Sequence, residues 1–160
     1  MPIQICFVCL GNICRSPTAE GIMHSLLMEH GLESQVTVDS AGTGAWHIGE
    51  PADSRSRDCA KRQGVTLTSS ARQVTRDDFD RFDLLLAMDR ENYADLIDLA
   101  PSAHRSKVRL FLSFQPEADR KDVPDPYFGG PGGFDNVYEI CVTGCLGLLS
   151  YLRDHYPLSA

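Results

Sequence analysis

Short apolar runs alternate along the chain with amphipathic segments, and this pattern predicts strands separated by helices. Segments rich in apolar and β-branched residues predict strands at residues 3–8, 36–39, 84–88 and 107–110. The first and third are apolar throughout, which is typical of parallel strands buried on both faces. Elsewhere apolar residues recur at helical spacing and predict helices at residues 17–30, 53–63, 90–99 and 134–155. Residues 75–78, Thr-Arg-Asp-Asp, resemble a capping box before a further short helix.

This order of elements predicts an α/β fold. Strands that alternate with helices form a parallel sheet covered on both faces, so we expect a three-layer sandwich around a central four-stranded parallel sheet. Sites in such folds lie beyond the carboxyl ends of the strands, which brings together Cys9, the glycine-rich turn expected from Ser40, and the loop after the fourth strand. An irregular segment at residues 113–133 is rich in Pro, Gly and Asp, and loops of this length are often functional.

The stretch from Cys9 to Pro17 joins the first strand to the first helix and has the features of an anion site. It reads Cys-Leu-Gly-Asn-Ile-Cys-Arg-Ser-Pro. Helix N-termini present unpaired N–H groups and partial positive charge, which favour a bound phosphate. Gly11 lets the backbone curl and Asn12 tolerates unusual dihedral angles. Ser16 suits the N-cap and Pro17 the first helical position, so the helix is expected to start there.

A cysteine at the centre of such a loop is a candidate nucleophile. Helix N-termini, cations and hydroxyl donors stabilise a thiolate, and Arg15 and Ser16 supply the last two. Arg15 also presents a planar fork that can hold two phosphate oxygens. The Cys-to-Arg spacing alone is a weak signal, but the apolar strand before it and the Ser-Pro helix start after it make it stronger. The sequence therefore predicts a loop that aims Cys9 at a bound phosphate.

Composition and charge narrow the function classes further. The chain has 160 residues, which predicts one domain over residues 1–160 with a proper core. It has no apolar run long enough for a membrane span and no signal-peptide pattern, so no membrane association is expected. The net charge of −7 argues against nucleic acid as a partner. Six cysteines without zinc spacing or a secreted context favour a reduced, cytoplasmic protein without a bound metal.

The loop, the later Asp125-Pro126-Tyr127 and the length together resemble the low-molecular-weight protein-tyrosine phosphatases, over essentially the whole chain. The resemblance implies hydrolysis of tyrosine-phosphorylated proteins through a phosphocysteine on Cys9, with no cofactor and as a monomer with at most weak self-association. Asp125 would be the general acid and base, although a solvated turn aspartate is the simpler interpretation of this residue alone; Asp122 is a weaker candidate. The implied phosphate-binding residues are Leu10, Gly11, Asn12, Ile13, Cys14, Arg15 and Ser16.

The resemblance also implies supporting roles around this loop. Asn12, Ser16 and Ser40 would shape the loop by hydrogen bonds, and Cys14 would pair with Cys9 on oxidation. Family members often carry a histidine where Ser69 stands, so a hydroxyl or a water must replace that contact. The mouth of the substrate pocket would be formed by Leu10, Ile13, Trp46, His47, Tyr127 and Phe128.

Three other functions remain open at this stage. Thioredoxin-coupled arsenate reductases have a similar loop, but they need further cysteines near the third strand, and this chain has none between Cys59 and Cys141. Relatives that resemble phosphoarginine phosphatases carry threonine where this chain has Ile13. A module that only binds phosphate would need neither Cys9 nor Asp125.

Overall fold

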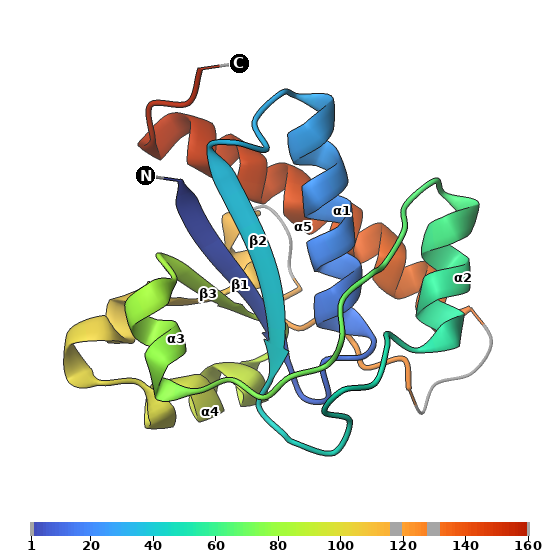
Figure 1. Ribbon diagram of the computed structural model, residues 1–160, viewed down its shortest axis with the longest axis horizontal. Helices are drawn as coiled ribbons and strands as arrows, with labels where there is room; N and C mark the ends of the chain where they lie inside the picture. Colours follow the sequence, from blue (N-terminus) through green and yellow to red (C-terminus); the bar gives the residue numbers. More distant parts are fainter. Residues whose placement is uncertain (1, 116–119, 128–131, 160) are drawn as a thin grey trace.

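The computed structural model describes residues 2–115, 120–127 and 132–159, and a four-stranded sheet lies at its centre (Figure 1). The strands are β1 (Ile3–Cys9), β2 (Val36–Gly42), β3 (Leu84–Ala87) and β4 (Val108–Leu110). All pairings are parallel and the spatial order is β2-β1-β3-β4. The predicted four-stranded parallel sheet is therefore confirmed.

Helices cover both faces of this sheet, as the alternation of strands and helices predicts (Figure 1). On one face Ile5 and Phe7 share a core with α1 (Arg15–Glu29) and α5 (Gly133–His155). On the other face Cys6 and Val8 pack with residues of α3 (Arg76–Arg81) and α4 (Arg90–Leu99). Successive β1 side chains point to opposite faces, so a strand that is apolar throughout serves two cores. The expected three-layer sandwich is confirmed.

The remaining elements extend these two helical layers. Helix α2 (Ser54–Arg62) packs against α5. Two 3-10 helices, η1 (Ser102–Lys107) and η2 (Phe111–Phe114), flank β4 and were not predicted. Thr75 and Asp78 form the expected capping box at the start of α3. No helix in the described part of the chain is long and apolar enough to cross a membrane.

The end of β2 differs from the prediction. We expected the strand to stop at residue 39 and a turn to follow from Ser40, because small residues and glycine favour turns. Instead β2 continues to Gly42, and Ser40 lies buried inside it, paired with Phe7 of β1. The small residues serve close packing: a Cβ on Gly42 would lie 2.8 Å from the Leu10 carbonyl oxygen. The loop after β1 therefore rests directly on the end of β2.

Candidate active site

The loop between β1 and α1 holds Cys9 at the bottom of a pocket, with only 2% of the residue exposed. The Asn12 backbone N–H donates to Cys9 Sγ at 3.3 Å, and Ser16 Oγ lies 3.0 Å from the same sulfur. The predicted cap is wrong, because α1 begins at Arg15 with Cys14 as its N-cap residue. Ser16 is inside the first turn, where its hydroxyl faces the thiol instead of capping the helix.

Arg15 is held rigidly beside the pocket floor, with 3% exposure. Its Nη1 donates to Asp89 Oδ2 at 2.5 Å and to the Val123 carbonyl oxygen at 3.1 Å, and its Nη2 lies 3.6 Å from Asp125 Oδ2. Burial lowers the pKa of Arg15, but the Cys9 sulfur and the Asp89 carboxylate more than offset this, so its pKa is raised. The guanidinium is therefore a permanent positive charge next to the sulfur.

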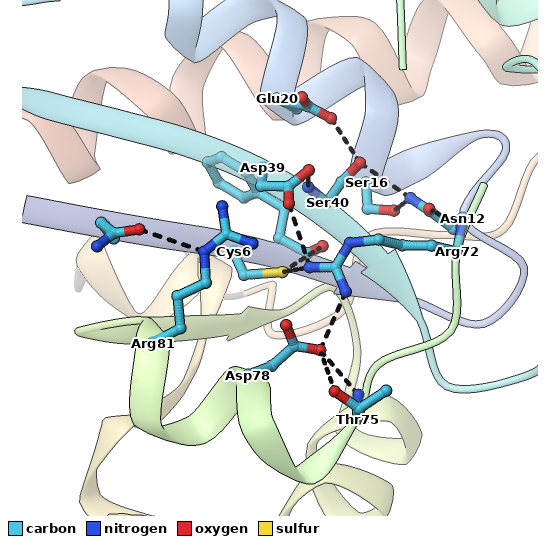
Figure 2. A network of polar contacts seen from close by, with 12 residues as sticks. Cys6, Asn12, Ser16, Glu20, Asp39, Ser40, Arg72, Thr75, Asp78 and Arg81 are labelled. Carbon is cyan, nitrogen blue, oxygen red and sulfur yellow. Dashed lines mark hydrogen bonds and ion pairs between the residues drawn. The ribbon is translucent and has the colours of Figure 1, made fainter. Parts of the chain in front are cut away.

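Asn12 connects the loop with Ser16, Ser40 and Arg72 (Figure 2). It has a positive φ of 58°, a conformation that asparagine tolerates better than most residues. Its Nδ2 donates to Ser16 Oγ and to Ser40 Oγ, both at 2.9 Å, and its Oδ1 accepts from the Arg72 backbone N–H at 3.0 Å. The predicted grouping of Asn12, Ser16 and Ser40 thus appears as one connected set of hydrogen bonds.

The carboxyl group of Glu20, which the sequence did not predict here, also belongs to this set of hydrogen bonds. Ser40 Oγ donates to Glu20 Oε1 at 2.5 Å. Burial raises the pKa of Glu20, while hydrogen bonds from Ser40 and Ser69 act in the opposite direction. Ser69, the position for which the sequence left a hydroxyl or a water open, lines the same hollow as Glu20.

Arg72 ties the network to two other elements (Figure 2). Its Nη1 donates to Asp78 Oδ2 at 3.0 Å, and its Nη2 donates to Asp39 Oδ2 at 3.2 Å. Asp78 also accepts from the Thr75 backbone N–H in the capping box of α3. The Arg72 guanidinium thus connects the start of α3 with β2, and the Arg72 backbone N–H donates to the Asn12 side chain.

The pocket above Cys9 has a volume of about 370 Å³ and a mouth with aromatic walls. Its lining includes the predicted Leu10, Ile13, Trp46, His47 and Tyr127, and the predicted Phe128 lies outside the described residues. Trp46 is 71% exposed, so it stands at the rim. Gly11 does not have a positive φ; instead a Cβ there would lie 3.1 Å from the His47 ring, so close approach explains this glycine.

The two candidate acids differ clearly in their surroundings. Asp125 lines the pocket, and its Oδ1 accepts from the Tyr127 backbone N–H at 3.1 Å. Asp122 does not line the pocket and forms an ion pair with Arg90 at 2.9 Å. Hydrogen bonds from Arg90 lower the pKa of Asp122, which keeps it ionised. The geometry therefore favours Asp125 over Asp122 as a proton donor.

The six cysteines are free and buried, and two of them line the pocket. Burial, together with nearby Asp53, raises the pKa of Cys14 to about 12. Burial raises the pKa of Cys141 to about 12 as well, and it raises that of Cys145 well above its usual range. At neutral pH these thiols therefore remain protonated. No group of three or more His, Cys, Asp or Glu in the described residues could hold a metal ion.

Sequence reasoning missed Asp89, although it interacts directly with Arg15. Asp89 is the N-cap of α4, where its Oδ1 accepts from the Asn92 backbone N–H at 2.7 Å. It follows β3 almost directly, so the strand-end rule that located Cys9 could have found it. By contrast, Val123 contributes only a carbonyl oxygen to Arg15, which no pattern of side chains reveals.

Comparisons with known proteins agree with this geometry. The family model described as low molecular weight phosphotyrosine protein phosphatase matches residues 4–157. The low molecular weight protein-tyrosine-phosphatase YfkJ of Bacillus subtilis is 41% identical over 157 residues, which covers 98% of this chain and 99% of that protein.

Solved structures show the same likeness. A protein tyrosine phosphatase from Entamoeba histolytica, crystallised with Hepes in its active site, superposes with a TM-score of 0.91 at 40% identity. The match covers 95% of this chain and 97% of that one. A Drosophila arginine phosphatase superposes with a TM-score of 0.89 at 30% identity, over 96% of this chain and all of that one.

Proposed function

Because the chain belongs to the low-molecular-weight protein-tyrosine phosphatase family, we propose that it hydrolyses phosphotyrosine in proteins and small aryl phosphates through a phosphocysteine on Cys9. One observation carries the proposal: Cys9, Arg15 and Asp125 line the same pocket. A nucleophile, a fixed cation and a carboxyl group are the parts that this reaction needs.

In the first step Cys9 Sγ attacks phosphorus in line with the leaving oxygen, so an S–P bond forms as the P–O bond breaks. Arg15 and the N–H groups of residues 10–16 bind the equatorial oxygens, where negative charge is held in the transition state. Asp125 donates a proton to the leaving phenolate. Its place among the residues that line the pocket supports this role.

In the second step water attacks the phosphocysteine. Asp125, now a carboxylate, accepts a proton from this water, and the S–P bond breaks to release inorganic phosphate and the Cys9 thiolate. The Ser16 hydroxyl, 3.0 Å from Sγ, stabilises the returning thiolate by donating a hydrogen bond. Arg15 and the amides supply the positive field, so we propose that the reaction needs no metal.

The shape of the pocket supports an aryl substrate. Ile13, His47 and Tyr127 provide walls for a flat ring, and the rings of His47 and Tyr127 lie 6.1 Å apart between centroids. A short phosphoserine side chain would not fill such a slot. Ile13, in place of the threonine of arginine phosphatases, favours the aryl phosphate over phosphoarginine.

We further propose that Cys14 forms a disulfide with Cys9 under oxidation and so protects the nucleophile from irreversible oxidation. Both cysteines line the pocket, which supports this role. Six free cysteines fit a reduced, cytoplasmic location. We propose tyrosine-phosphorylated proteins as partners and a monomer as the active form.

A substrate panel tests the function. The purified protein should hydrolyse a phosphotyrosine peptide and p-nitrophenyl phosphate much faster than phosphoserine or phosphoarginine peptides, and it should not reduce arsenate with thioredoxin. Cys9→Ser should abolish hydrolysis while phosphate binding remains. Asp125→Ala should lower turnover by about two orders of magnitude, the range typical of general acids. Full activity of Cys9→Ser, or a preference for phosphoarginine or arsenate, would overturn the proposal.

A further inference from the structure

Arg55, in the first turn of α2, lies against the rings of two residues from other segments. Its guanidinium carbon is 5.4 Å from the centroid of the Tyr127 ring and 4.6 Å from that of the Phe134 ring. Both distances fall within the range in which a cation is attracted to an aromatic face. Arg55 is not among the described residues that line the active-site pocket, whereas Tyr127 is. An effect of Arg55 on the reaction would therefore pass through a neighbour such as Tyr127.

Asp53 holds the Arg55 guanidinium in this position. Its Oδ1 accepts from Arg55 Nε at 3.0 Å and its Oδ2 accepts from Nη2 at 2.9 Å, a two-point contact that fixes the plane of the guanidinium. The Asp53 backbone N–H donates to the Ile13 carbonyl oxygen at 2.7 Å, so this pair is tied to the loop after β1. Phe134 packs against a cluster that includes Ile13. Arg55 thus has a fixed place relative to that loop.

The contacts of Arg55 go beyond the capping of α2. Asp53 is the N-cap residue of this helix, and its Oδ1 accepts from the Arg55 backbone N–H at 2.8 Å. Any residue except proline supplies that N–H, so the cap does not require a guanidinium. An exposed ion pair contributes little to stability, and half of the Arg55 side chain is exposed. The contact with Tyr127 is therefore the feature of Arg55 that these structural roles leave unexplained.

Tyr127 connects this contact to the proposed general acid. Its backbone N–H donates to Asp125 Oδ1 at 3.1 Å, while Asp125 Oδ2 lies 3.6 Å from Arg15 Nη2. Tyr127 is 38% exposed, so packing in the core holds its ring only weakly. A contact that fixes the Tyr127 ring therefore also helps to fix the direction of the Asp125 carboxyl group.

We propose that Arg55 is a positioning residue, which holds Tyr127 and through it keeps the Asp125 carboxyl group directed into the pocket. This rests on the proposed function and deepens it, because it assigns a residue outside the pocket to the proton-transfer step. A general acid gives its proton to the leaving oxygen only when the two lie within hydrogen-bond distance. Loss of the Arg55 contacts lowers the fraction of molecules in which Asp125 is so placed. Phosphate binding by residues 10–16 does not depend on that fraction.

The kcat/KM for phenyl phosphate tests this proposal, because its poor leaving group depends on the acid. Contacts of an exposed cation with two aromatic rings bias the placement of Asp125 by about fivefold, so Arg55→Gln should lower kcat/KM by about fivefold. In the Asp125→Asn background, where the acid is absent, Arg55→Gln should leave kcat/KM unchanged. Lys61→Gln is the control for charge and should match wild type, since Lys61 is an exposed cation in the last turn of α2.

The inhibition constant of inorganic phosphate shows whether the pocket is intact, and it should be the same in wild type and Arg55→Gln. A weaker affinity for phosphate in Arg55→Gln would refute the proposal, because Arg55 would then support the pocket itself. An equal loss of kcat/KM from Arg55→Gln in the wild-type and Asp125→Asn backgrounds would also refute it, as would no loss in wild type or an equal loss in Lys61→Gln. If wild type hydrolyses neither phenyl phosphate nor p-nitrophenyl phosphate, the proposed function itself fails.

Discussion

Asn12 provides the sharpest test of how the loop between β1 and α1 is held together. Its side chain makes three hydrogen bonds, to Ser16, Ser40 and the Arg72 backbone, and its backbone has a positive φ. Two substitutions separate these contributions. Asn12→Gly removes the side-chain bonds but keeps a residue that tolerates the positive φ, whereas Asn12→Ala removes the bonds and adds backbone strain.

The expected magnitudes follow from these contacts. Each hydrogen bond contributes about 1 kcal/mol net, so losing three destabilises the fold by about 3 kcal/mol. Alanine in the left-handed region is less favourable than glycine by about 1 kcal/mol, even though glycine gains more entropy on unfolding. Asn12→Ala should therefore lose about 4 kcal/mol in total, with about 3 kcal/mol for Asn12→Gly.

Urea denaturation followed by circular dichroism measures both variants, and p-nitrophenyl phosphate turnover reports on the site. Without the Asn12 amide, Ser16 is free to rotate away from Cys9 Sγ, so kcat should fall about tenfold in both variants because the donors to the thiolate are misplaced. Equal stability of the two variants would show that the positive φ carries no strain. A loss below about 1 kcal/mol in both would refute the bonding role of the side chain.

Three further predictions concern groups around the site. Asp122→Asn should weaken the contact with Arg90 and so loosen the segment that holds Asp125. Because poorer leaving groups depend more on the acid, kcat/KM should fall more for phenyl phosphate than for p-nitrophenyl phosphate. Equal effects on the two substrates would contradict this. Burial raises the pKa of Glu20 above its ordinary 4.5, so the stabilisation from its protonated form is present at low pH and is lost as the pH rises through the raised value. The free energy of unfolding of wild type should therefore fall relative to that of Glu20→Gln between pH 4 and pH 7. A constant difference between the two proteins would disprove this. Since the pKa of Cys14 is about 12, iodoacetamide at pH 7 should leave Cys14 unmodified in a peptide mass map, and its rapid labelling would contradict that assignment.

The candidate site residues that lie together in the structure, as expected, are those that a local pattern places. Cys9 ends a buried strand and Arg15 begins the helix after the next short loop, and strand order alone brings Ser40 near them. The helix start was predicted two residues too late. Serine is a preferred N-cap residue, but the Ser16 hydroxyl bonds to the Cys9 thiol and to Asn12 instead of capping the helix. The contact between Ser16 and the Cys9 thiol here overrides the ordinary preference of serine for the N-cap.

The parts that were missed depend on contacts between distant segments. Arg72 joins Asp39, 33 residues away, to Asp78, which the sequence predicted only as part of a capping box, and neither Arg72 nor Asp39 belongs to a motif that predicts this contact. Glu20 lies on α1 facing Ser40, and its distance in sequence hides that contact. Such networks depend on how the layers pack, which periodicity and spacing do not specify.

The most direct test of the account is to trap the phosphorylated enzyme. Rapid acid quenching during turnover of a phosphotyrosine peptide, followed by proteolysis and mass spectrometry, should find one phosphoryl group on the peptide that contains Cys9 and none in Cys9→Ser. A phosphoryl group on any other residue, or normal turnover with no phosphorylated enzyme at any quench time, would contradict the central claim that Cys9 is the nucleophile.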